Sequence, residues 1–200
     1  MRLFSNFGLS ACCLAVVLSA TAATAADSPA FRGVRGDGQS DEQVPVKWSA
    51  KENVKWRIAL PFTGHSTPVI SKGRVFLTCA NKQGTQRGLY CYDRKTGKEL
   101  WKQTVAFSKV EPTHKTNPYG ASSPVTDGER VVVWHGSAGL FCYDHSGKLQ
   151  WKIDPGDVTH IWGYASSPVI YNDRVFLHHG PGIQTFMLAV SLSSGKQLWK

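Results

Sequence analysis

Histidine is the residue type in this chain with the most direct chemical potential, because three imidazoles in a suitable geometry can hold a transition metal. Three of the seven histidines, His65, His114 and His160, lie on segments that lead into a recurring Ser-x-Pro-Val phrase. Convergence of those segments would bring the three imidazoles together. They do not share a repeat position, however, since His65 aligns with Ala121 and Ala165. The sequence therefore favours surface or hydrogen-bonded histidines over a metal site.

Cysteine is the second reactive residue type. Cys12 and Cys13 fall within the N-terminal apolar segment, which leaves Cys79, Cys91 and Cys142. An odd number of cysteines does not form a disulfide framework. Cys91 and Cys142 take the same repeat position, which indicates small, buried residues in packed strands. A pairing of Cys79 with Cys91 in an oxidising compartment is a minor alternative.

Two further histidines, His135 and His179, occupy equivalent positions at the ends of two β-rich runs and align with Cys79. A histidine that repeats in this way favours a packing role, and we expect the neighbouring His178 to be exposed.

Two long loops, 110–119 and 158–164, concentrate tyrosine, tryptophan and histidine. Loops that carry such side chains suit recognition of a protein, a glycan or a small ligand. The alternative is that Trp162 and Tyr164 only cover an inner wall of the fold. The candidate ligand-facing residues, including one before the first Ser-x-Pro-Val phrase, are His65, His114, Tyr119, His160, Trp162 and Tyr164.

The elements that must position these loops come from a repeat. A short apolar run, a Gly-Lys turn and a second run that closes in tryptophan recur at 91–101, 142–151 and 189–199. The closing residues Trp101, Trp151 and Trp199 are spaced by about 50 residues, a period typical of propeller blades. Glycine at each turn permits the positive φ of a tight hairpin; these residues are Gly97, Gly147 and Gly195.

Each repeat offers four β-rich runs punctuated by Gly, Asn and Asp, which predicts one four-stranded antiparallel blade per repeat. We expect an all-β fold with blades at about 64–102, 120–152 and 163–200. The run 53–60, with Trp56 in place of a closing tryptophan, predicts an N-terminal strand that closes a ring. Closed rings have about four to eight blades. Three blades form an open arc, so we expect either part of a longer protein or an arc that assembles with other copies.

The phrase from Cys91 to Trp101, Cys-Tyr-Asp-Arg-Lys-Thr-Gly-Lys-Glu-Leu-Trp, resembles the tryptophan-docking motif of the PQQ-like, quinoprotein-alcohol-dehydrogenase-like β-propellers. The copy that ends at Trp151 is one residue shorter, and the third has Ser191 in place of the motif's Asp. The resemblance covers about 150 residues. It implies that each tryptophan packs on the adjacent blade and that Trp101, Trp151 and Trp199 are structural.

The same resemblance raises the possibility of pyrroloquinoline quinone and Ca²⁺ on the ring axis, held in the dehydrogenases of this family by acidic residues and an adjacent cysteine pair. Residues 27–200 contain no adjacent cysteines, and Asp154 and Asp157 need no role beyond turn formation. We therefore predict no catalytic residue, metal or cofactor, and keep quinone and Ca²⁺ for the alternative function only.

The N-terminus indicates export. Arg2, the apolar run 14–18 and the small residues Ala23-Thr24-Ala25 are typical of a secretory signal peptide, which we assign to 1–26. Cys12 in a lipobox-like context offers lipidation, and hence membrane association, as an alternative. Residues 27–45 are expected to form a leader loop before the repeats at 46–200. Its Phe-Arg-Gly segment at 31–33 resembles the start of exported PQQ-like proteins common in Planctomycetes.

The composition and the distribution of charge limit the classes of partner that the chain could bind. The chain has 200 residues, is 42% hydrophobic and 18% charged, and carries a formal charge of +9. This balance is globular, and the basic residues are dispersed over turns and strand ends instead of forming a patch. We expect no nucleic-acid partner and no transmembrane span. The sequence favours an exported, periplasmic or secreted, non-catalytic binding or scaffold propeller; the alternative is the N-terminal part of a quinone-dependent alcohol or sugar dehydrogenase.

Overall fold

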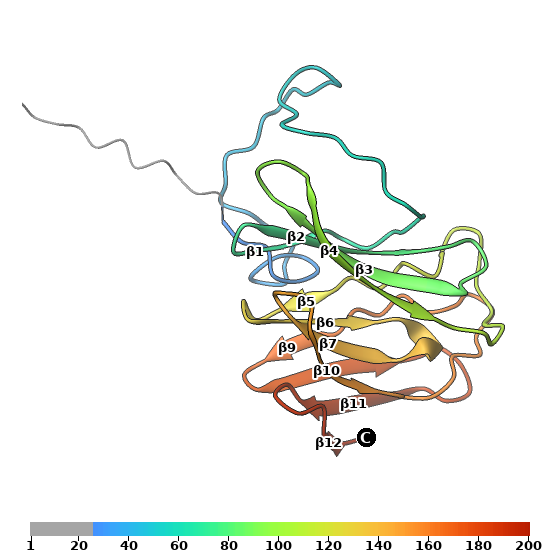
Figure 1. Cartoon of the computed structure of the whole chain (residues 1–200). Helices are drawn as coiled ribbons and strands as arrows, with labels where there is room; N and C mark the ends of the chain where they lie inside the picture. Colours follow the sequence, from blue (N-terminus) through green and yellow to red (C-terminus); the bar gives the residue numbers. More distant parts are fainter. Residues whose placement is uncertain (1–25) are drawn as a thin grey trace, which may run out of the picture.

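The computed structural model describes residues 26–200, which form three stacked four-stranded antiparallel sheets, an incomplete β-propeller (Figure 1). The expected cleavage motif and the lipobox cysteine lie outside the described residues. No helix in the described part is long and apolar enough to cross a membrane.

Each sheet is one blade whose strands pair in chain order, as short hairpin connections dictate. Blade 1 ends beyond the expected residue 102. Its strands are β1 (Val69–Ser71), β2 (Arg74–Ala80), β3 (Gln86–Asp93) and β4 (Glu99–Ala106). Blade 2 contains β5 (Val125–Thr126), β6 (Arg130–Trp134), β7 (Leu140–Asp144) and β8 (Leu149–Ile153), with the 3-10 turn η1 (Gly136–Ala138) between β6 and β7. Blade 3 contains β9 (Val169–Tyr171), β10 (Arg174–His179), β11 (Phe186–Ser191) and β12 (Gln197–Trp199).

The core lies between the blades. Successive side chains of a strand point to opposite faces of its sheet, so each central strand contributes to two interfaces. Blade 2 shows this directly: Val131 and Val133 pack toward blade 1, whereas Val132 and Trp134 pack toward blade 3. The apolar runs of the central strands therefore follow from burial on both sides.

The expected closing strand at 53–60 is wrong in one respect, because these residues form no strand in the structure. All three sheets already hold four strands, so this backbone has no further sheet to join among residues 26–200. Its tryptophan is nevertheless placed by a neighbour: the Trp56 indole Nε1 donates a hydrogen bond to the Arg94 carbonyl oxygen (2.9 Å).

Candidate functional site

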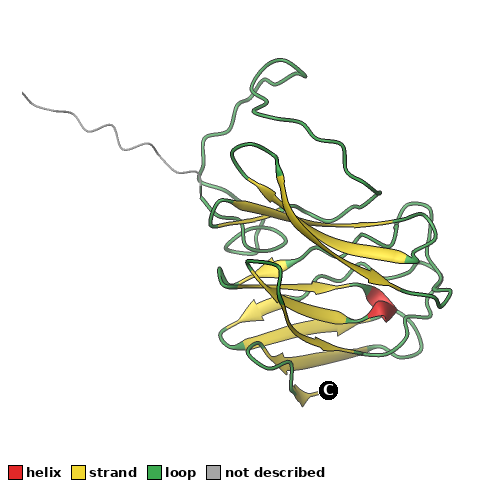
Figure 2. Ribbon diagram, in the orientation of Figure 1, coloured by secondary structure: helices red, strands yellow, loops and turns green. Residues whose placement is uncertain are grey.

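The loops that connect β2 to β3, β6 to β7 and each blade to the next leave the same end of the antiparallel blades. We call this end the loop face; it lies on the right in Figure 1, and η1 marks it in Figure 2. The opposite end, with the β1–β2 and β3–β4 turns of blade 1 and their equivalents, is the turn face. Both predicted ligand-binding loops, 110–119 and 158–164, belong to the loop face.

A buried ion pair lies directly beneath the loop face. Arg87, on β3, places Nη1 2.7 Å from Oε2 of Glu111, and both side chains are 1% exposed. The same Nη1 donates to the His135 carbonyl oxygen (2.6 Å), and Arg87 Nε donates to the Gly84 carbonyl oxygen (2.9 Å). One guanidinium therefore ties blade 1, the loop to blade 2 and blade 2 itself together. Its planar set of donors suits such a node better than an ammonium would.

Three aromatic rings surround that guanidinium. The Arg87 Cζ atom lies 4.6 Å from the Phe107 ring centroid, 4.7 Å from that of Tyr119 and 5.7 Å from that of Tyr164. The faces of aromatic rings stabilise a desolvated cation. Tyr119 also donates its hydroxyl to the Glu111 carbonyl oxygen (2.6 Å), and the Tyr164 hydroxyl donates to the Tyr119 carbonyl oxygen. Two of the predicted ligand-facing residues, Tyr119 and Tyr164, are thus part of the platform beneath the face.

Burial perturbs the titratable groups of this cluster. It raises the pKa of the Glu111 carboxyl, and the neighbouring Arg87 guanidinium only partly offsets that effect. It lowers the pKa of His135 to about 3, and Arg87 adds to the lowering. Glu111 Oε1 and His135 Nε2 have no hydrogen-bond partner. The expectation of a packed His135 agrees with its 1% exposure.

A tilted pair of aromatic rings, His114 and Trp162, lies in the loops next to this platform. The His114 and Trp162 rings stand 4.3 Å apart between centroids, and Trp162 is 51% exposed. Asn117 holds the two loops together, because its Nδ2 donates to the carbonyl oxygens of Trp162 (2.6 Å) and Tyr164 (3.2 Å). The structure therefore brings two predicted residues into one exposed aromatic feature.

The other two predicted histidines add no ring to the His114–Trp162 pair. His65 is exposed, and its backbone N–H donates to the Gly120 carbonyl oxygen (2.9 Å). His160 accepts the Trp162 backbone N–H at its Nδ1 atom (3.3 Å). Among residues 26–200, no three His, Cys, Asp or Glu side chains are placed to hold a metal ion.

The three cysteines among residues 26–200, Cys79, Cys91 and Cys142, are free and buried in the blades. The suggested pairing of Cys79 with Cys91 is wrong, because Cys79 faces Gly88 across the β2–β3 ladder, three residues from Cys91. That offset is about 10 Å along a strand, too far for a disulfide. Burial raises the pKa of the Cys79 thiol to about 11 and those of Cys91 and Cys142 to about 12, as expected for unreactive packing residues.

On the turn face, tryptophans contact the glycine turn of the following blade. Trp101 Nε1 donates to the His145 carbonyl oxygen (2.9 Å), and a Cβ atom on Gly147 would lie 2.8 Å from the Trp101 ring. Trp151 bonds the Leu192 carbonyl oxygen (2.8 Å) and faces Gly195 in the same way. Trp199 is 44% exposed and contacts Phe176 of its own sheet.

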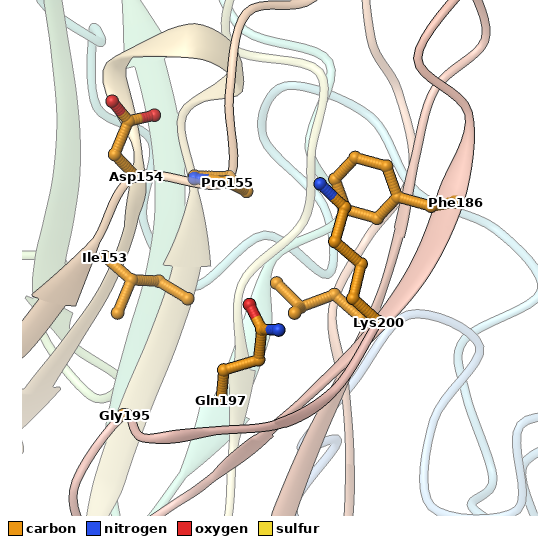
Figure 3. Close-up of a pocket in the computed structure, with 8 residues that line it drawn as sticks. Ile153, Asp154, Pro155, Phe186, Gly195, Gln197 and Lys200 are labelled. Atoms are coloured by element: carbon orange, nitrogen blue, oxygen red, sulfur yellow. The ribbon is translucent and has the colours of Figure 1, made fainter.

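A small hollow of about 140 Å³ lies between blades 2 and 3 near Lys200 (Figure 3). Asp154 and Gln197 bring polar groups to it, and the Lys200 Nζ atom lies 3.9 Å from the Phe186 ring centroid. Neither His114 nor Trp162 lines this hollow, so it is separate from the aromatic pair on the loop face.

Two residues that organise the loop face, Arg87 and Glu111, were not predicted from the sequence. A usable signal was present: Arg87 begins the otherwise apolar and aromatic run that continues through Tyr92. A charge at the start of a buried strand requires a buried partner.

The fold and the repeated turn contacts can be compared with those of known proteins. A family model described as outer membrane protein assembly factor BamB matches residues 85–200, more than half of the chain. The chain belongs to this family. The finding confirms the PQQ-like resemblance; the finer likeness to planctomycete proteins stays a prediction.

Solved structures of the BamB-type fold agree. BamB from Moraxella catarrhalis is similar with a TM-score of 0.54 at 13% identity, over 75% of this chain and 44% of its own. A europium-containing methanol dehydrogenase gives a TM-score of 0.53 at 16% identity, over 68% of this chain and 24% of its own. This chain thus spans less than half the length of either protein, and identities this low show the fold alone. No curated protein matches the sequence.

Proposed function

We propose that this member of the BamB-type family is an exported, non-catalytic scaffold propeller that binds a protein partner through its loop face. The observation that carries the proposal is the half-exposed Trp162 ring, held in a tilted contact with the His114 ring. Tryptophan is enriched among the residues that dominate binding energy at interfaces. A large ring left in solvent on a fixed loop is therefore a candidate anchor.

The surroundings of Trp162 favour a protein over a small ligand. Val110, Ile161 and Ile183, from three loops of the same face, are exposed. Four hollows in the described residues have linings that include neither His114 nor Trp162. Small-molecule sites are concave, whereas apolar side chains that stand out from a surface suit a macromolecular partner.

The buried Arg87–Glu111 cluster next to the His114–Trp162 pair supports the same proposal. The Arg87–Glu111 pair fixes loop 107–124 to blade 1, and the Asn117 bonds hold that loop against loop 154–168 before any partner arrives. Preorganisation of this kind reduces the entropy lost on binding. The description of the matching family as an outer membrane protein assembly factor also agrees with a protein-binding role. Export, with 1–26 removed, 27–45 as leader and 46–200 as propeller, is part of the proposal.

Site-specific photo-cross-linking in cells tests the proposed face. A benzophenone amino acid replaces Ile161 on the loop face or, as the matched control, Lys95 on the turn face; both positions are exposed. We expect a discrete protein adduct from position 161, no adduct from position 95, and loss of the first adduct in the Trp162→Ala background. Equal adducts from both faces, or an adduct that survives Trp162→Ala, would contradict the proposal.

The alternative, part of a quinone-dependent alcohol or sugar dehydrogenase, draws support from the fold it shares with the methanol dehydrogenase. Among residues 26–200, no three His, Cys, Asp or Glu side chains gather at one place, so nothing in this part of the chain favours this alternative over the scaffold. Dye-linked oxidation of primary alcohols or aldoses by the purified chain with added quinone and Ca²⁺ would favour this alternative, and we expect none.

A further inference from the structure

The segment 54–60 lies against blade 1 in the manner of a strand, but its backbone makes no hydrogen bond to any described residue. Its side chains alternate, because Trp56 and Ile58 are partly buried whereas Lys55 and Arg57 are exposed. The outer strand of blade 1, β4, shows the same alternation. A segment with this alternation and with free N–H and C=O groups is a template for another strand.

Trp56 fixes the position of this segment. A Cβ atom on Gly97 would lie 2.7 Å from the Trp56 ring, and Trp101 covers Gly147 in the same way. Each of the two indoles also donates a hydrogen bond to a carbonyl oxygen of the turn that it covers (2.9 Å in both). The segment therefore takes the place toward blade 1 that β4 takes toward blade 2.

A hollow of about 470 Å³ lies between this segment and blade 1. Apolar side chains line most of it, among them Leu60 of the segment and Ile70, Val75 and Leu77 of blade 1. A strand added to the free edge of 54–60 would direct every second side chain into this hollow, because successive side chains of a strand point to opposite faces. Free backbone groups beside an apolar hollow are the two parts of a site for strand addition.

The junction between blades 1 and 2 shows which side chains fill the equivalent place. In blade 2, Val131 and Val133 of β6 stand where the β2 side chains stand in the hollow. They pack in one cluster with Leu89 and Cys91 of β3, the third strand of the preceding blade. The place is thus filled by a large apolar side chain and, two residues later, a small one.

The strand paired with the closing tryptophan has the same pattern in all three blades. The residue opposite the tryptophan is small; the pairs are Cys91–Trp101, Cys142–Trp151 and Ala189–Trp199. Two positions earlier the side chain is large and apolar; these residues are Leu89, Leu140 and Met187. Side chains directly opposite each other on paired strands are neighbours, so a small partner leaves room for the indole.

We propose that residues 54–60 and the adjoining hollow bind a β-strand of a partner protein, added antiparallel to the free edge of the segment. The partner strand carries alanine or cysteine opposite Trp56 and a large apolar residue opposite Ile58. The strands of residues 26–200 already pair within the three blades, so none of them is left to take this place. The site uses no residue of the loop face, and the two proposals can therefore fail separately.

Amide hydrogen exchange of the purified full chain with a synthetic peptide tests the site. The probe peptide has the sequence 87–93 with Cys91→Ala, which fits the pattern, and the control peptide has Cys91→Trp instead. We expect amides in 54–60 to exchange rapidly in the chain alone, and about tenfold more slowly with the probe peptide because their N–H groups become bonded. The control peptide should leave them unchanged. Equal protection by both peptides, or protection by neither, would overturn the proposal.

Two tryptophan variants locate the bound peptide. Trp56→Ala removes the ring that holds the segment on blade 1, and Trp48→Ala is the matched control because this tryptophan is 72% exposed in the same N-terminal region. Fluorescence anisotropy of the labelled probe peptide should show binding weaker by about tenfold in Trp56→Ala and unchanged in Trp48→Ala. Equal binding to both variants would place the peptide elsewhere and overturn the site. The exchange experiment uses the native chain, so it stands even if Trp56→Ala weakens the fold.

Exchange in the absence of peptide tests the free edge itself. Protection of 54–60 that grows with protein concentration would mean that a second copy occupies the edge. Protection that does not depend on concentration would mean that this chain occupies it. Either result would overturn a partner strand at this site.

Discussion

The two ends of the blades differ in how they join neighbouring blades. On the turn face the same contact is made three times: an indole N–H bonds a carbonyl of the next turn at 2.8–2.9 Å and the ring covers that turn's glycine. The pairs are Trp56 with Gly97, Trp101 with Gly147 and Trp151 with Gly195. On the loop face each junction is built differently, with a buried ion pair between blades 1 and 2 and a tilted, partly exposed aromatic pair between the loops that flank blade 2.

This difference indicates that the turn face holds the blades together, whereas the loop face can recognise a partner. A repeated contact can only place one blade on the next, because it offers every junction the same surface. The loop-face residues vary between junctions and can therefore distinguish a partner. The predictions below test that separation, starting with the largest expected effect.

The repeated contact should dominate stability. Trp151→Ala should lower the free energy of unfolding by about 3–5 kcal/mol, because it removes a buried ring, its hydrogen bond to Leu192 and the cover on Gly195. Trp199→Ala is the matched control: the same repeat position, but 44% exposed instead of 8%, so its cost should be about 1 kcal/mol or less. Urea unfolding followed by circular dichroism measures both. Similar losses would show that the contact with the next blade contributes little.

The ion pair under the loop face should come next. Glu111→Leu leaves the Arg87 cation buried without its carboxylate and should cost about 3–5 kcal/mol. The double variant Arg87→Met/Glu111→Leu removes the stranded charge as well, so it should unfold at a higher urea concentration than the single variant. A double variant that is less stable than Glu111→Leu would mean that Arg87 stabilises the fold mainly through its aromatic and carbonyl contacts.

The glycine turns offer a smaller and cleaner comparison. Gly73→Ala and Gly195→Ala place a side chain at nearly the same positive φ, 75° and 70°. A Cβ on Gly73 meets open space, whereas one on Gly195 would lie 2.8 Å from the Trp151 ring. Gly73→Ala should cost about 1 kcal/mol from backbone strain, and Gly195→Ala about 2–4 kcal/mol because the collision is added. Equal unfolding midpoints would show that the ring moves aside freely.

The repeated turn-face contacts could be predicted from the sequence, whereas the loop-face contacts, which do not repeat, could not. The closing tryptophans and turn glycines repeat, so the blades, their four strands and the gathering of the loops could be predicted before any coordinates. The Arg87–Glu111 pair could not, because its members are 24 residues apart at positions that do not repeat. Trp56 was expected on a strand that closes a ring. Its indole bonds the Arg94 carbonyl in the glycine turn of blade 1, but its backbone joins no sheet among residues 26–200.

The leader illustrates the same limit. Three glycines and several charges in 32–41 indicate a loop, but no pattern shows which edge that loop contacts. Ser28 exchanges backbone hydrogen bonds with Ile70 of β1, and the Pro29 carbonyl accepts one from Thr126 of β5. Both contacts require that β1 and β5 have free inner edges next to each other. Such information exists only once two blades have been placed side by side.

His135 should give the effect most specific to the loop face, a slope of stability against pH. Its imidazole takes up a proton below about pH 6.5 in the unfolded chain but only near pH 3 when buried beside Arg87. The unfolded state therefore binds more protons between these values, so the free energy of unfolding should fall as the pH drops through this window, by at most about 1.4 kcal/mol per pH unit.

His135→Phe keeps an aromatic ring and removes the titration, so its stability should depend less steeply on pH than that of the native protein between pH 6.5 and 4. His65→Phe, at an exposed position, should retain the native slope. Urea midpoints measured at half-unit intervals decide between the two. If His135→Phe keeps the native slope, the loss of stability in acid has its origin in the carboxylates, and the buried imidazole is protonated as easily in the folded protein as in the unfolded one.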